Sequence, residues 1–110
     1  MLASHIYRQR LIIEGYSNFL TVQNIDKLLV QLSKKLKMTI LGHVETRYNE
    51  EVKGWAAWCH WTTSGCHLYT WDKDRFFSVD IYTCKEFDID TAIEVVKEII
   101  NPVELEYKQI

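Results

Sequence analysis

The sequence has no long apolar run and no block of like charge. No stretch approaches the roughly 20 apolar residues that a helix needs to cross a bilayer, and residues 1–10 lack the apolar core of a signal peptide. The 13 basic and 15 acidic side chains are interspersed, so no basic patch is available for nucleic acid or a membrane surface. We therefore expect a cytoplasmic protein that binds small molecules or proteins, and neither nucleic acid nor membrane.

Cysteine is also scarce, with Cys59, Cys66 and Cys84 forming an odd set in a chain without a secretory signal. This set predicts reduced thiols rather than a disulfide framework. The pairs Cys59-His60 and Cys66-His67 contain side chains that zinc prefers. Neighbouring residues of a strand point to opposite faces, however, so these pairs cannot bring four ligands to one ion. We predict no metal site.

Linkers, repeats and low-complexity segments are absent, and 110 residues with 47% hydrophobic content suit one domain spanning residues 1–110. Residue patterns predict strands at 8–16, 38–46, 55–63, 66–71, 76–84 and 103–107. Helical spacing of apolar residues predicts one helix over 25–36, capped by Asn24, and a second capped by Asp90 and ending at Asn101-Pro102. The expected fold is an α+β two-layer sandwich, an antiparallel sheet with two helices on one face.

Alternation along the strands separates two faces of this sheet. We expect Ser64-Gly65 to form a hairpin turn, which places Cys59, Trp61, Cys66 and Leu68 in the core under the helices. The other face then collects polar and aromatic side chains: Glu14, His60, His67, Tyr69, Asp80 and Cys84. Such an open face favours a ligand site or a homodimer contact, and a merely solvated surface is the alternative.

The segment 54–84 carries a specific pattern: Ser64, then Thr70-Trp71, then the strand Val79-Asp80-Ile81-Tyr82-Thr83-Cys84. This pattern aligns without gaps with the short, pyruvoyl-dependent prokaryotic form of S-adenosylmethionine decarboxylase, which the chain resembles over nearly its whole length. The first strand, with Glu14, also resembles the first strand of that family. The resemblance implies the same fold.

The resemblance also implies a chemistry. In that family the serine matching Ser64 splits the chain, here at the Thr63-Ser64 bond, and becomes a pyruvoyl cofactor for decarboxylation of S-adenosylmethionine in spermidine synthesis. The cysteine matching Cys84 donates a proton, and an acidic residue matches Glu14. The implied cofactor is thus a pyruvoyl group derived from Ser64 if the chain is processed, and otherwise none.

Several positions depart from the family pattern. The Glu-Ser-His of the cleavage point is Thr63-Ser64-Gly65, the histidine that assists elimination is Tyr69, and a serine that helps processing is Ala56. The Pro-Glu that holds the substrate ribose is Asp72-Lys73, and Tyr48 stands nearest to the expected adenine-stacking phenylalanine. Alanine cannot form the hydrogen bond of a serine, and neutral tyrosine is a poor base near neutral pH.

Three functions remain compatible with these residues. The first is an active decarboxylase in which Tyr69 or His67 replaces the missing histidine. The second is an uncleaved binding or regulatory subunit, and the third is a pyruvoyl enzyme for another amine, suggested by Lys73. We predict a divergent family member that processes itself inefficiently. The candidate catalytic residues are Ser64, Cys84, Tyr69 and Glu14, and the candidate ligand-binding residues are Glu14, His67, Asp72, Lys73 and Tyr48.

Overall fold

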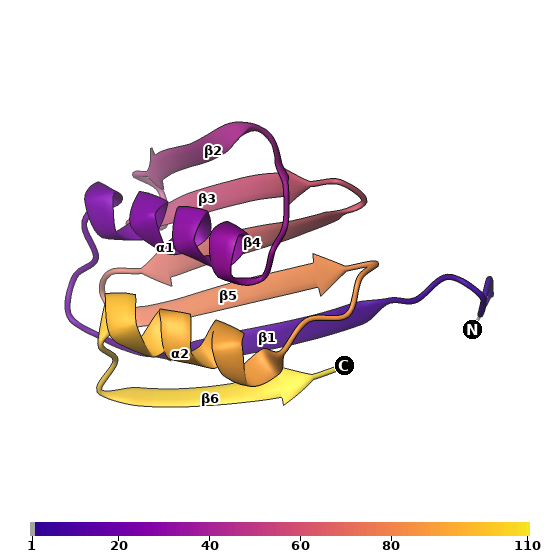
Figure 1. Cartoon of the computed structure of the whole chain (residues 1–110). Helices are drawn as coiled ribbons and strands as arrows, with labels where there is room; N and C mark the ends of the chain where they lie inside the picture. The colour runs from indigo at the N-terminus through magenta and orange to yellow at the C-terminus, as the bar shows by residue number, and fades with distance from the viewer. Residues whose placement is uncertain (1) are drawn as a thin grey trace.

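The computed structural model describes residues 2–110, which form a six-stranded sheet with two helices (Figure 1). In chain order the elements are β1 (Gln9–Tyr16), α1 (Val22–Lys35), β2 (Ile40–Asn49), β3 (Gly54–Trp61), β4 (Ser64–Trp71), β5 (Phe76–Thr83), α2 (Ile89–Ile100) and β6 (Glu104–Gln109). The strand order is β2-β3-β4-β5-β1-β6, and every neighbouring pair is antiparallel. Both helices lie on the same face of the sheet (Figure 1). The predicted α+β architecture is confirmed.

The core lies between this face and the helices, because strands and helices each present one apolar side to it. On the central strands β1, β3, β4 and β5, buried residues alternate with more exposed ones, and the buried set includes Leu11 and Ile13 of β1 and Val79 of β5. The helices contribute apolar stripes with a period near 3.6 residues: Ile25, Leu28, Leu29 and Leu32 from α1, and Ala92, Ile93 and Val96 from α2. Alternation leaves the opposite sheet face without a helical cover.

Both helices begin earlier than predicted. The α1 cap is Thr21, whose side chain accepts a hydrogen bond from the Asn24 backbone N–H at 3.1 Å. The α2 cap is Asp88, which accepts from the Asp90 N–H at 3.0 Å. Asn24 and Asp90 were therefore wrong as caps: each is the residue whose amide the true cap satisfies. The predicted end of α2 is confirmed, because Asn101 adopts a left-handed conformation with φ of 53°.

The β3–β4 turn also differs from the prediction. Its two turn residues are Thr62 and Thr63, and Ser64 lies in β4 opposite Trp61. Thr63 takes a left-handed φ of 56°, although serine and glycine favour turns more strongly than threonine does. The predicted face assignment is nevertheless correct, because moving the turn by two residues preserves the two-residue alternation of side chains. Cys59 and Cys66 accordingly lie opposite each other in the core.

The core contains a buried serine hydroxyl. Ser33 of α1 is 2% exposed, and its hydroxyl donates to the Leu29 carbonyl at 2.7 Å. The same hydroxyl accepts from the indole Nε1–H of Trp61 at 2.7 Å. The pair joins α1 to the end of β3, immediately before the turn that carries Thr63.

Candidate functional site

The sheet face away from the helices, called here the open face, has its side chains in cross-strand rows. One row runs Trp58, His67, Asp80 and Ile12 across β3, β4, β5 and β1. The next row along the strands runs Ala56, Tyr69, Ser78 and Glu14. Tyr69 is exposed, and the other seven residues are half-buried. The open face therefore presents charged and aromatic groups on a rigid platform.

A hollow of about 390 Å³ lies on the open face at the end of the sheet where β4 begins. We call it the Ser64 hollow, and its lining includes Arg10, His60, Thr63, Ser64, Gly65, His67, Asp80 and Tyr82. Of the residues expected to take part in catalysis or ligand binding, it contains Ser64 and His67. It also contains Thr63, the other residue of the expected cleavage bond.

Cys84 lies directly beside Ser64, just after the end of β5. The Cys84 backbone N–H donates to Ser64 Oγ at 3.1 Å, and that hydroxyl lies 3.9 Å from Cys84 Sγ. The Thr63 hydroxyl also contacts Cys84 Sγ and donates to the Thr62 carbonyl at 2.6 Å. The sheet register thus brings Thr63, Ser64 and Cys84 together, although 20 residues separate Ser64 from Cys84.

An ion pair between Arg10 and Asp80 forms one side of the Ser64 hollow. Arg10 Nε donates to Asp80 Oδ1 at 3.0 Å, and Nη2 donates to Oδ2 at 2.8 Å. The hydrogen bond and charge of Asp80 raise the pKa of Arg10. Sequence reasoning placed Asp80 on this face but did not identify Arg10 as a site residue. The only available signal was that Arg10 shares the alternation of Glu14 on the first strand.

Two histidines and a tyrosine follow one another on the open face. The rings of His60 and His67 have centroids 6.5 Å apart and are nearly perpendicular, at 86°. His67 and Tyr69 have centroids 6.3 Å apart with nearly parallel rings, at 8°. Five residues of strand separate Ser64 from Tyr69, which is about 16 Å at 3.3 Å per residue. Within one chain, Tyr69 therefore lies away from Ser64.

Glu14 lies in a second hollow of the open face, about 420 Å³ in volume, together with Ile12, Glu106 and Lys108. Four residues of β1 separate Glu14 from Arg10, which is about 13 Å along the strand. The register pairs Glu14 with Ser78 on one side and Glu106 on the other. One chain therefore does not bring Glu14 and Ser64 into a single hollow.

Tyr48, Asp72 and Lys73 lie at the opposite end of the sheet from Ser64. The Tyr48 hydroxyl donates to Asp72 Oδ2 at 3.0 Å, and its ring packs edge-on against Trp55 at 5.0 Å. Loss of solvent around the phenol, together with the hydrogen bond to Asp72, raises the pKa of Tyr48. Asp72 and Lys73 belong to the turn between β4 and β5. Tyr48 and Asp72 are therefore in contact, and Lys73 is the next residue of the turn.

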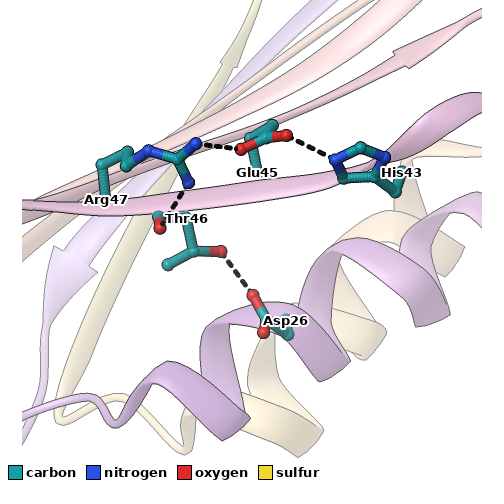
Figure 2. Close-up of polar contacts among 5 residues, drawn as sticks. All are labelled: Asp26, His43, Glu45, Thr46 and Arg47. Carbon is teal, nitrogen blue, oxygen red and sulfur yellow. Dashed lines mark hydrogen bonds and ion pairs between the residues drawn. The ribbon is translucent and has the colours of Figure 1, made fainter.

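The edge of the open face at β2 is held by a chain of polar contacts (Figure 2). Glu45, opposite Trp58, pairs with His43 and, at 2.7 Å, with Arg47 Nη2. The hydrogen bond from His43 is the main cause of the lowered pKa of Glu45. Thr46, on the other side of the strand, contacts Asp26 of α1. The Thr46–Asp26 contact joins the edge strand to the helix layer.

Two structural features concern the predicted partners. Among residues 2–110, no three His, Cys, Asp or Glu side chains are grouped so that they could hold a metal ion. In the same residues, neither helix has the length and apolarity needed to span a membrane.

Comparisons with known proteins bear on the family. The sequence model of S-adenosylmethionine decarboxylase matches residues 10–110. Curated protein sequences give no match. Among solved structures, the crystal structure of the adenosylmethionine decarboxylase from Aquifex aeolicus VF5 is similar with a TM-score of 0.79 and 16% identity, over 96% of this chain and 89% of that one. That likeness supports the fold, and the sequence match over residues 10–110 places the chain in the S-adenosylmethionine decarboxylase family.

Proposed function

We propose that this chain is a divergent family member, linked to spermidine synthesis, that binds S-adenosylmethionine or a related amine and cuts its Thr63-Ser64 bond inefficiently. The observation that carries this proposal is the hydrogen bond from the Cys84 N–H to Ser64 Oγ, at 3.1 Å. This hydrogen bond orients the Ser64 hydroxyl, which is the nucleophile of self-cleavage.

Self-cleavage begins when Ser64 Oγ attacks the carbonyl carbon of Thr63, so that an ester replaces the amide. The attack needs a free lone pair on Oγ and a donor that stabilises the tetrahedral intermediate. Oγ here accepts from the Cys84 amide on the neighbouring strand, which engages one lone pair and directs the hydroxyl towards β5. We propose that this orientation of the hydroxyl, rather than the use of one of its two lone pairs, slows the first step in the uncut chain.

The second step, elimination, needs a base to remove the α-proton of residue 64. The family histidine is Tyr69 here, and a phenol is a poorer base than an imidazole. Ala56, which replaces the family serine, lies opposite Tyr69 and has no hydroxyl. Both substitutions remove groups that processing uses, which supports inefficient cleavage.

The residues around Ser64 fit a pyruvoyl group only in part. Ser64 could supply it, and Cys84 Sγ, 3.9 Å from Ser64 Oγ, could deliver a proton there. The group would supply a carbonyl that takes up the electrons released with carbon dioxide. Ala56 and Tyr69 fit poorly, because they replace residues that the family uses to form the pyruvoyl group. We therefore propose that the Ser64 hollow acts mainly as a binding site.

A working decarboxylase is the second candidate, and Thr63 favours it. A β-branched residue with φ of 56° is strained, at a typical cost of about 1–3 kcal/mol. Cleavage on the carboxyl side of Thr63 would release that strain. The strained residue thus favours cutting, whereas Tyr69 and Ala56 oppose it.

We also propose that the chain forms a homodimer through the open face. Tyr69, Trp71 and Tyr82 are all substantially exposed there, and a second copy would remove their rings from water. Because Tyr69 lies about 16 Å from Ser64 along its own strand, only a partner subunit could bring a Tyr69 side chain close to Ser64.

The test measures binding and turnover in parallel. Isothermal titration with S-adenosylmethionine should give a heat of binding of about one ligand per chain, and carboxyl-labelled S-adenosylmethionine should release labelled carbon dioxide only in proportion to the small cut fraction. The Ser64→Ala variant is the control for turnover, because it cannot form a pyruvoyl group. Abundant release of carbon dioxide that disappears in Ser64→Ala would establish the working enzyme instead. Absence of a binding heat would reject the binding function.

A further inference from the structure

We propose that Arg10 is a specificity-determining residue of the Ser64 hollow and binds the carboxylate of an α-amino acid ligand. The hollow would then prefer the amino acid to the amine formed by its decarboxylation. This inference rests on the proposed binding function and adds the class of ligand.

The first argument is the geometry of the guanidinium. A guanidinium has five N–H donors in a planar fork, arranged so that two edges can each hold a carboxylate. Asp80 occupies the edge formed by Nε and Nη2, at 3.0 and 2.8 Å. Among residues 2–110, no acceptor is bound by Nη1 of Arg10. The edge formed by Nη1 and Nη2 is therefore available to a second carboxylate.

The second argument is position. Arg10 lies opposite Tyr82, which in turn lies opposite Gly65, the residue after Ser64. The ion pair holds the guanidinium over β5, one strand spacing of about 4.8 Å from β4. The Arg10 side chain is 43% exposed and lines the same hollow as Ser64. Asp80 lies opposite His67, three residues along β4 from Ser64, so the carboxylate of a ligand bound at Arg10 would lie in the hollow near His67.

The third argument is chemical. Loss of carbon dioxide converts an anionic carboxylate into a neutral molecule, so a cation that binds the carboxylate stabilises the reactant more than the transition state. Asp80 is already paired, which weakens its attraction for a ligand cation. An Arg10–Asp80 pair in this place therefore suits retention of the amino acid and opposes its decarboxylation.

The experiment compares two ligands on three proteins by isothermal titration. On the wild type, S-adenosylmethionine should bind about 10- to 100-fold more tightly than decarboxylated S-adenosylmethionine, the usual effect of a charged hydrogen-bonded pair. Arg10→Gln should abolish this preference. Arg47→Gln is the matched control, because Arg47 is also an ion-paired arginine but lies on edge strand β2. It should retain the preference.

The outcomes separate the two proposals. Exposed ion pairs contribute little to stability, so Arg10→Gln should fold, and its thermal melt should match that of Arg47→Gln. Equal binding of both ligands to the wild type, or an unchanged preference in Arg10→Gln, overturns the role of Arg10 while leaving the binding function intact. Failure of both ligands to bind the wild type overturns both.

Discussion

Ala56 and Tyr69 lie directly opposite each other on β3 and β4. Cross-strand partners have Cβ atoms about 5 Å apart and interact as a unit. The resemblance matches these two positions to a serine and a histidine, and we propose that the chain lacks two processing groups at one place on the open face. Restoring one of them leaves the other missing.

The double change Ala56→Ser with Tyr69→His should therefore produce partial cleavage at Ser64. Loss of one positioned acid–base group commonly slows a step by about 10²- to 10⁴-fold, so each single change should produce less cleavage than the pair. Gel electrophoresis over time gives the cut fraction, and adding Ser64→Ala to the double variant should abolish it. If the double variant stays whole, then Thr63, Gly65 or the turn geometry limits cleavage.

The three thiols should differ sharply in reactivity. Cys59 and Cys66 are 1% and 0% exposed, and burial raises the pKa of both thiols. A raised pKa keeps a thiol protonated and unreactive to higher pH, whereas Cys84 is partly exposed at a strand end. A thiol reagent at pH 8 should modify one cysteine in the native protein and three after denaturation. Rapid native labelling of two or more would contradict the packing.

Ser33→Ala should destabilise the fold, because it leaves the indole N–H of Trp61 buried without an acceptor. The expected loss in the free energy of unfolding is about 1–3 kcal/mol. Urea unfolding followed by circular dichroism, at one protein concentration, measures it. Ser78→Ala on the open face is the control and should change stability by less than about 0.5 kcal/mol. Equal effects of the two changes would argue against the buried hydrogen bond.

The homodimer is testable by sedimentation. The wild type should have twice the mass of the chain at micromolar concentration, and Trp71→Glu should weaken the dimer by placing a charge on the open face. Val30→Glu changes an equally exposed apolar residue on α1, on the helical side, and should leave the dimer intact. A strictly monomeric wild type, or equal effects of the two charges, would reject this interface.

The two-residue alternation along the strands correctly predicted which side chains face the core. Cys59 and Leu68 were assigned to the core correctly, even though the turn was placed two residues late, because alternation survives such a shift. The helix caps Thr21 and Asp88 were missed because several polar residues precede each apolar stripe, and only the backbone conformation selects among them.

The site was less predictable, because distances along and between strands depend on register. Alternation placed Glu14 and His67 on one face but could not show that they occupy separate hollows. Alternation likewise gave no reason to pair Arg10 with Asp80, which are 70 residues apart and meet only through the β1–β5 register.

Denaturing mass spectrometry of the purified protein tests the central claim most directly. The account predicts mainly one species of about 13.1 kDa, the intact chain, because the Ser64 hydroxyl is bound to the Cys84 amide and the family's processing groups are replaced. Two fragments, one ending at Thr63 and the other beginning with a pyruvoyl group, as the main species would contradict the account and identify the chain as a processed decarboxylase.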